Sequence, residues 1–336
     1  MASQTDHLEL EHEVHDGKED WSGGAAPFQV SYGKLMMWYF LLSDAFTFAG
    51  LLIAYGALRF SSPTWPSPDF VFSTHPFGDS HLPLIFVTVM SFLLIISSVT
   101  MVRAVQEGQR ENKSGVVFWL LMTVLGGLSF LGCQAWEWTN LIAKEHVTLT
   151  TNPFSVHNAA GVYLAADGSD AKNADGSTEQ FKSGDGYLIH KATILTDNND
   201  PRGKAGHQAE GDHGDGHHHE VFVYKSQLPL DEKDRYVDEK GYIHRKFKVI
   251  EGPDAGLVRT EEFGPKAFGA LFFFITGFHG FHVFSGVAFL LIIAINAASG
   301  LYVARKNGYE MVEKIGLYWH FVDLVWVFVF LVFYLL

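Results

Sequence analysis

The stretch from Ile315 to Leu336 constrains the fold most, because it is almost wholly apolar and aromatic. A helix of this length crosses a bilayer at about 1.5 Å rise per residue. Near its start, however, His320 and Asp323 share one helix face at i,i+3 spacing. Ionisable side chains inside a membrane span are costly unless they face protein, a partner or water. The stretch therefore indicates a packed membrane assembly and not a simple anchor.

Four more stretches have the same apolar character, and we predict membrane spans over about residues 35–58, 83–102, 116–142 and 268–298. The predicted fold class is therefore an all-α transmembrane bundle of five helices with a mostly irregular or β-rich extramembrane insert. The predicted organisation is an acidic cytoplasmic tail (1–33), three helices (34–142), the insert (143–267) and two helices (268–336).

Small and hydroxylated residues in two of these spans predict contacts between helices. Ser97, Ser98 and Thr100 can bond backbone carbonyls or cross to another helix, and Gly126 and Gly127 allow two helices to approach closely. The single cysteine, Cys133, lies inside a span, so no disulfide framework is expected.

The insert carries short alternating runs at residues 187–195, 220–224 and 242–249, which predict a few β-strands separated by turns. His213 and His217–His219 lie in a cluster rich in Gly, Asp and His. That cluster has two interpretations: a site for a divalent metal, or a flexible loop that tolerates any polar residue.

The net charge of −13 argues against nucleic acid as a partner. The first thirty or so residues are polar and acidic, so no cleavable signal peptide is predicted.

The short loops after the second and fourth spans are the basic ones, and the positive-inside rule places such loops in the cytoplasm. We therefore predict a cytoplasmic N-terminus, with the insert and the C-terminus outside, in the periplasm if the cell is a Gram-negative bacterium.

Asp44 interrupts the first predicted span about 14 Å along the helix. A carboxylate at that depth either packs against a neighbouring helix through a hydrogen bond or handles protons or water. The residues alone leave both roles open. An independent proton-coupled transporter using Asp44, His320 and Asp323 is a further alternative, but the paired repeats and broken helices typical of transporters are not visible.

Three histidines within spans, His279, His282 and His320, could in principle ligate haem or copper. The glycines around the first two favour close helix packing over room for a large cofactor. The chain also lacks a Cys-x-x-Cys-His signal, a nucleophile motif and a phosphate loop. The residues alone thus favour polar side chains that lock helices together or hold lipid headgroups. With Asp323, these histidines predict a polar seam between the last two helices.

Two motifs in these helices can be compared with a known family. They are Thr276-Gly277-Phe278-His279-Gly280-Phe281-His282-Val283 with Gly286, and Glu313 followed by Leu317-Tyr318-Trp319-His320-Phe321-Val322-Asp323 with Trp326. They closely resemble the last two helices of cytochrome c oxidase subunit III, a haem–copper oxidase family. More loosely, Gln134-Ala135-Trp136-Glu137 is similar to that family's Gln-Ala-x-Glu, and Ser43-Asp44 occurs where the family has Ser-Glu. The resemblance covers all five spans but leaves out the tail and the insert.

The resemblance implies a subunit of an oxygen-reducing, proton-pumping oxidase that carries no catalytic centre, haem or copper of its own. Subunits I and II would hold the haem and copper. This chain would pack on subunit I, hold phospholipids in a cleft and support proton uptake during turnover. The electron donor would be cytochrome c or a quinol. We favour cytochrome c because the insert could lie near such a donor or contribute to a larger respiratory supercomplex.

Carried over by position, Asp44 becomes the proton-related candidate. The helix-packing and lipid-cleft candidates are Glu137, His279, His282, Arg305, Lys306, Glu313, Trp319, His320 and Asp323. No metal ligand is expected in this chain. The chain departs from the family in two ways: it has five predicted helices where the long form has seven, and aspartate replaces glutamate at position 44.

Overall fold

The computed structural model describes residues 31–73, 84–165, 168–173, 176–191, 238, 240–304 and 308–336. Within these ranges, five helices are long and apolar enough to cross a membrane. They are α1 (Tyr32–Ser61), α3 (Ile85–Gln109), α4 (Lys113–Ala143), α6 (Lys266–Ala298) and α8 (Glu310–Phe330), the last extended by a π-helical turn, η1 (Leu331–Leu335). The prediction of a five-helix transmembrane bundle is confirmed, and every helix begins a few residues from the expected start.

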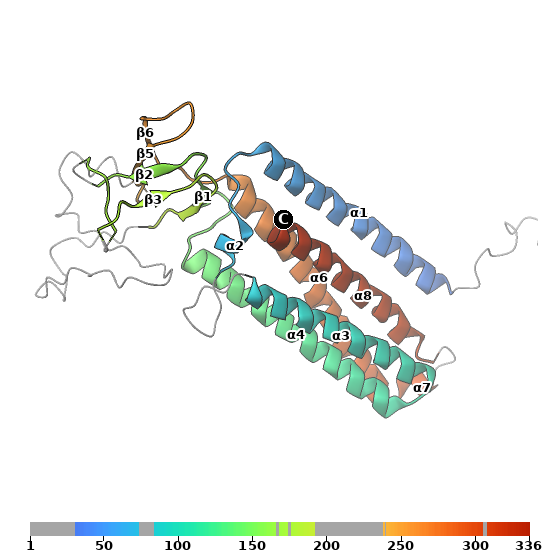
Figure 1. Ribbon diagram of the computed structural model, residues 1–336. Helices are drawn as coiled ribbons and strands as arrows, with labels where there is room; N and C mark the ends of the chain where they lie inside the picture. Colours follow the sequence, from blue (N-terminus) through green and yellow to red (C-terminus); the bar gives the residue numbers. More distant parts are fainter. Residues whose placement is uncertain are drawn as a thin grey trace, which may run out of the picture.

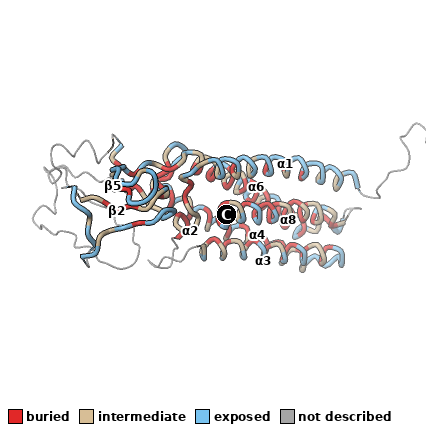
Figure 2. The backbone as a smooth tube through the Cα atoms, turned by 45° about the horizontal axis from the view of Figure 1, so that its top comes forward, coloured by how far each residue is buried: buried red, intermediate tan, exposed pale blue. Residues whose placement is uncertain are grey.

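Helix α8 lies at the centre of the bundle (Figure 1). It packs against α3, α6 and α1, while α3 pairs closely with α4, and α4 with α6. Helix α1 packs on α6 and α8 only at its inner face, and its outer face is exposed along the helix (Figure 2). Because these exposed side chains are apolar, they suit lipid or a neighbouring membrane protein.

Glycines set the closest helix contacts, because a side chain would not fit there. A Cβ atom added to Gly127 of α4 would lie 2.6 Å from both Trp319 of α8 and Val287 of α6. A Cβ atom added to Gly126 would lie 2.6 Å from the Ser97 side chain of α3. The prediction that these two glycines permit close approach is confirmed.

The insert forms two small antiparallel sheets at the end of the bundle that also carries the C-terminus (Figure 1). One sheet pairs β1 (Phe154–Val156) with β4 (Gly186–Leu188). The other has the order β3-β2-β5-β6, formed by β3 (Gln180–Phe181), β2 (Gly161–Tyr163), β5 (Lys246–Val249) and β6 (Val258–Thr260). The prediction that the insert contains β-strands is therefore confirmed.

The strand predictions were only partly correct in extent. Of the described residues in the first and third runs, 187–191 and 242–249, only residues 187–188 and 246–249 lie in strands, with one isolated bridge between Lys191 and Tyr242. Residues 192–195 lie outside the described ranges. The other strands have two or three residues each, too few for alternation to be recognised. The run at 220–224, the histidine cluster at 213–219 and most of the acidic tail lie outside the described residues.

The insert is seated directly on the bundle through the connector after α1. Phe70, in the short helix α2 (Pro68–Val71), meets Phe154 of β1 edge to face, with ring centroids 5.8 Å apart. Gly186 of β4 lies so close to Phe70 that an added Cβ atom would be 2.9 Å from its ring. The Asn152 side chain also donates to the Pro265 carbonyl at the start of α6, at 3.1 Å. These contacts fix the sheets relative to the helices.

Helix ends follow ordinary capping rules. The Asn112 side chain accepts from the Gly115 amide and starts α4. Gly300 has a φ of +80° and ends α6, where few other residues could adopt that conformation. The single-turn helix α7 (Leu301–Ala304) follows it.

Candidate functional site

Asp44 and His282 meet inside the bundle, although they are 238 positions apart in sequence. Asp44 lies on the inner face of α1 and His282 on α6, and the Asp44 Oδ2 and His282 Nε2 atoms are 3.2 Å apart. Both side chains are about nine-tenths buried, at 9% and 10% exposure. Phe48 and Phe278 flank the imidazole, with ring centroids 5.6 and 4.6 Å away. The intramembrane carboxylate is thus paired, and its partner is one of the predicted histidines.

The hydrogen bonds of His282 determine how this pair can hold a proton. His282 Nδ1 lies 2.7 Å from the Phe278 carbonyl oxygen. A carbonyl can only accept, so Nδ1 must carry a hydrogen, and Nε2 is left to face Asp44. One further proton is then needed between Nε2 and the carboxyl group, either on aspartic acid or on an imidazolium beside a carboxylate. Both arrangements are neutral overall, which suits a low-dielectric position.

Tyr318 fixes the backbone around this pair from α8. Its hydroxyl group lies 3.0 Å from the His282 carbonyl oxygen, to which it donates, and 2.9 Å from the Ser285 hydroxyl. These bonds join α6 to α8 directly beside the Asp44–His282 pair. The Tyr318 ring also stacks against Phe40 of α1 at a centroid distance of 6.3 Å.

His279 lies one turn before His282 but has a different environment. It is fully buried, and neither ring nitrogen has a hydrogen-bond partner among the described residues. The rings of Phe48, Phe130 and Trp326 surround it, with centroids 6.4, 5.8 and 5.2 Å away. These contacts come from α1, α4 and α8, so His279 packs four helices together.

His320 and Asp323 face α3 and do not join the first two histidines. His320 Nδ1 lies 2.6 Å from the Ser98 hydroxyl, and the Trp319 indole donates to Ser97 at 3.1 Å. Asp323 is 7% exposed, and neither of its oxygens makes a hydrogen bond within the described part of the chain. The prediction that Ser97 and Ser98 bond across helices is confirmed. The prediction of a single polar seam between the last two helices is wrong, because the pair His279 and His282 and the pair His320 and Asp323 have different neighbours.

Two further candidates lie near opposite ends of the helices. The buried Glu137 of α4 accepts from the Tyr334 hydroxyl of η1, with its two oxygens 3.1 and 3.0 Å away. At the other end, Glu313 of α8 forms an ion pair with Lys34 of α1. Both contacts tie helices together, which fits the packing role expected for Glu137 and Glu313.

The remaining candidates cannot be placed. Arg305 and Lys306 lie outside the described residues, as does the histidine cluster considered for a metal. Among the residues that are described, no group of three or more His, Cys, Asp or Glu side chains could hold a metal ion.

Sequence reasoning did not find Lys34 or Tyr334, which complete two of these contacts. Each lies far along the chain from its partner, so no local spacing connects them. The third partner, Ser98, was identified only as a hydroxyl able to bond across helices.

A second buried polar cluster lies in the insert and was not anticipated. The Tyr163 hydroxyl donates to Glu261 at 2.9 Å, and His157 Nε2 lies 2.9 Å from the same hydroxyl. Arg245 covers the Tyr163 ring at 3.8 Å and holds Glu179 through two hydrogen bonds of 2.9 and 2.7 Å. Burial raises the pKa of Glu261 to about 7 and lowers the pKa of His157 to about 4. The cluster links β2 and the residue just before β5 to the chain entering α6.

The long apolar helices and the buried polar contacts between them define a multi-pass membrane protein. Residues 262–336, which include α6 and α8, match the profile of a family described as cytochrome c oxidase subunit III. The chain is 35% identical over 95 residues to a probable cytochrome c oxidase subunit 3 of Rickettsia prowazekii, covering 28% of this chain and 29% of that protein. It is 30% identical over 148 residues to quinol oxidase subunit 3 of Bacillus subtilis, covering 43% of this chain and 65% of that protein.

A third relative is cytochrome c oxidase subunit 3 of Marchantia polymorpha, which is 44% identical over 68 residues, or 20% of this chain and 24% of that protein. The matched part thus spans less than two thirds of the length of each of these relatives. The matches show that the chain is similar to subunit III of haem–copper oxidases, of the cytochrome c or quinol type. The resemblance drawn from the sequence motifs is confirmed.

Proposed function

We propose that this chain is the subunit III of a terminal oxidase that reduces oxygen, oxidises cytochrome c and pumps protons. The observation that carries the proposal is the family match over residues 262–336, which contains His279, His282, His320 and Asp323. We place the chain in the inner membrane of a bacterium, with the N-terminus in the cytoplasm and the insert and C-terminus in the periplasm. The charge of the short loops supports this orientation.

Within such a complex, the chain would contribute contacts and no redox centre. Haem and copper would reside in subunits I and II, and oxygen reduction would take place there. This chain would pack on subunit I through an apolar helix face, of which the exposed side of α1 is one example. Phospholipid would bind beside the polar residues of α1 and α6, with Arg305 and Lys306 as partners for a phosphate.

The Asp44–His282 pair is the proposed proton-related element. Its geometry requires one proton between an acid and a base inside the membrane span. A pair of this kind can exchange a proton with a neighbouring donor while remaining neutral itself. We propose that it supports proton uptake by the oxidase during turnover, although aspartate is one methylene shorter than the family's glutamate.

The insert is the proposed contact with other respiratory proteins. Its seating on the bundle through Phe70 and Asn152 gives it a fixed position at one membrane surface. A fixed domain at that surface could bind a cytochrome c donor or a larger respiratory assembly.

A quinol oxidase is the second candidate. The specific observation in its favour is the Bacillus subtilis quinol oxidase subunit 3, for which the match covers a larger share of both chains than the other two matches described. Measuring which donor the purified complex oxidises, reduced cytochrome c or a quinol, decides between the two.

The test of the whole proposal is purification in mild detergent through a tag on this chain. We expect haem and copper to co-purify in other polypeptides, with the spectrum of a haem–copper oxidase. Recovery of this chain alone, with proton-coupled transport activity after reconstitution, would instead support a transporter. A haem Soret band from the isolated chain would support a redox protein.

A further inference from the structure

Glu261 is a buried carboxyl group in the insert, located just after β6 and shortly before α6 begins. The residue is only 3% exposed. Its Oε1 atom accepts from the Tyr163 hydroxyl at 2.9 Å, and its Oε2 atom accepts from the Arg245 backbone amide at 3.3 Å. Both donors are neutral groups. Within the described residues, no cationic side chain is therefore bonded to this carboxyl group.

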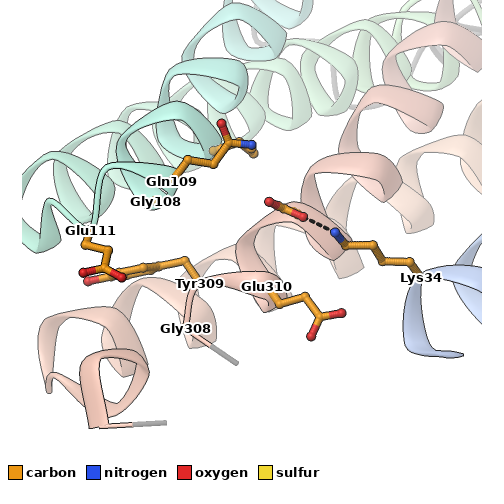
Figure 3. Close-up of a pocket in the computed structure, with 9 residues that line it drawn as sticks. Lys34, Gly108, Gln109, Glu111, Gly308, Tyr309 and Glu310 are labelled. Carbon is orange, nitrogen blue, oxygen red and sulfur yellow. Dashed lines mark ion pairs between the residues drawn. The ribbon is translucent and has the colours of Figure 1, made fainter. Parts of the chain in front are cut away.

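Other carboxylates of the structure meet their cations directly. Glu313 lines a pocket of about 340 Å³ at the opposite end of the bundle from the insert, and it forms an ion pair with Lys34 (Figure 3). In the insert, Glu179 accepts two hydrogen bonds from the Arg245 guanidinium group, of 2.9 and 2.7 Å. Glu261 thus lies near a cation that another carboxylate already binds.

The Arg245 guanidinium group lies between these two carboxylates. Its Cζ atom is 3.8 Å from the centroid of the Tyr163 ring, and the hydroxyl of that ring contacts Glu261. An arginine side chain in this position can turn toward Glu179, as it does in this structure, or toward Glu261. Because a guanidinium group pairs with a carboxylate through two parallel N–H bonds, it can form the full pair with only one of them at a time.

The Arg245–Glu179 pair fastens one edge of the larger sheet. Arg245 directly precedes β5 and Glu179 directly precedes β3, and β2 lies between these two strands (Figure 1). β3 is an edge strand of only two residues, so its backbone pairing with β2 is short. The side-chain pair across β2 therefore reinforces an edge that backbone pairing holds weakly by itself.

The other titratable groups around Glu261 are histidines, tyrosines and carboxylates. His244 contacts the Glu261 backbone, with Nδ1 2.8 Å from the carbonyl oxygen. His157 lies beyond the tyrosine, and burial lowers its pKa to about 4, so it is neutral near pH 7. From β4, the Tyr187 hydroxyl bonds to the backbone of the next residue. Three more carboxylates lie beside these side chains: Asp185, Asp238 and Glu262. Of all these groups, Arg245 is the permanent cation.

We infer that the insert contains a pH-dependent clamp formed by Glu261, Arg245 and Glu179. While Glu261 holds a proton, Arg245 stays on Glu179 and keeps the β3 edge closed. When Glu261 loses its proton, the buried negative charge attracts Arg245 away from Glu179, and the β3 edge is released. The clamp responds to the pH of the aqueous side on which the insert lies, and the inference does not rest on the oxidase proposal.

The direction of the response follows from proton linkage. Burial raises the pKa of Glu261 to about 7 in the clamped state. In the released state, pairing with Arg245 would keep this pKa at or below the ordinary value of about 4.3. Protonation therefore favours the clamped state, and this preference is complete below about pH 4.3 and lost as the pH rises through 7. Between pH 6 and pH 8, the ratio of released to clamped molecules should rise about tenfold.

The test is amide hydrogen exchange of the full chain, in whatever complex it purifies with, at pH 6 and pH 8. Rates are corrected for the intrinsic effect of pH. The reporters are the Tyr163 and Glu179 amides, which bond to the Glu179 and Ala171 carbonyl oxygens. We expect their protection to fall about tenfold from pH 6 to pH 8. Glu261→Gln should keep it high at both values, and Glu179→Gln should lower it already at pH 6. The matched control Glu262→Gln removes the neighbouring exposed carboxylate and should respond like the wild type.

An equal response in the wild type and in Glu261→Gln would overturn the inference. Loss of the response in His244→Gln would do the same, because it would assign the sensing to the histidine. Unchanged protection of Glu179→Gln at pH 6 would show that the pair does not hold the edge. A monodisperse elution profile shows that each variant is folded.

Infrared difference spectra between the two pH values provide a second readout. The wild type should lose a C=O band of a protonated carboxyl group that Glu261→Gln lacks. If this band titrates while the exchange of Tyr163 and Glu179 does not change, the carboxyl group binds a proton without operating a clamp, and the inference is wrong.

Discussion

Breaking the Asp44–His282 pair should reveal a favourable coupling energy between two helices that are far apart in sequence. Asp44→Leu leaves His282 Nε2 facing Phe48 and Phe278 without a partner. An unpaired buried polar group costs about 1–3 kcal/mol. Hydrogen bonds between transmembrane helices average about 0.6 kcal/mol and reach about 1.7 kcal/mol. Because this pair is nine-tenths buried, we expect a coupling energy of about 1–2 kcal/mol.

The assay is equilibrium unfolding of the purified chain in mixed micelles, followed by tryptophan fluorescence. The four proteins are the wild type, Asp44→Leu, His282→Leu and the double variant, which form a double-mutant cycle. A matched control cycle uses Ser43→Ala in place of Asp44→Leu, together with His282→Leu. The Ser43 hydroxyl bonds only within its own helix, to the Phe40 carbonyl. The control cycle should be additive within about 0.3–0.5 kcal/mol.

Additive costs for Asp44 and His282 would refute the reasoning, because they would show that the two side chains do not interact. Asp44→Asn should cost less than Asp44→Leu, since its amide can still donate to Nε2. In the oxidase that we propose, Asp44→Ala should assemble but lose proton pumping or become inactivated during turnover. Intact pumping and intact resistance to inactivation would leave Asp44 with a structural role only.

Three other predictions follow from the packing and the insert. Gly127→Ala should destabilise the bundle by about 1–3 kcal/mol, because the added methyl group would lie 2.6 Å from Trp319. The control Gly132→Ala should not destabilise it, since there is open space around Gly132. Equal thermal stability of the two variants would contradict the close contact between Gly127 and Trp319. In the wild type, the insert should lose about 3 kcal/mol of stability as the pH rises from about 4.3 to 7, because protonation of the Glu261 carboxyl, whose pKa is about 7, favours the folded state. Glu261→Gln should abolish this pH dependence. Amide exchange of β5 and β6 at several pH values measures it, and an identical pH profile in the variant would count against it. Replacing residues 192–237 by a short Gly-Ser linker should preserve the fold, since Lys191 pairs with Tyr242 and the Asp238 amide bonds to the Tyr242 carbonyl. If the replaced segment contacts the electron donor, the change should also weaken oxidation of a soluble cytochrome c. An unchanged rate and affinity would exclude the contact.

The pH prediction for Glu261 depends on the direction in which folding shifts the pKa of its carboxyl group. A carboxyl whose pKa is raised on folding binds its proton more tightly in the folded state, so its contribution falls as the pH rises through 7. His157 acts in the opposite sense, because burial lowers its pKa to about 4 and protonation below about pH 6.5 disfavours the fold. The comparison of wild type with Glu261→Gln isolates the first effect.

The sequence by itself determined the class of fold and the family that the chain resembles. Span length and hydropathy are local properties, and every backbone group in a membrane span must bond within its own helix. Five apolar stretches therefore predict five helices whatever their arrangement. The motifs around His282 and His320 are equally local, and they led to the same family as the comparisons.

Only the tertiary structure decided which polar residues meet. No sequence motif connected Asp44 with His282, yet the two side chains face each other, while His320 faces Ser98. The direction of a side chain around a helix axis limits its possible neighbours, but the packing order of the helices selects one. Strands of two or three residues in the insert were missed for a related reason. They are held by pairing with distant segments, and that information is not contained in any short stretch of sequence.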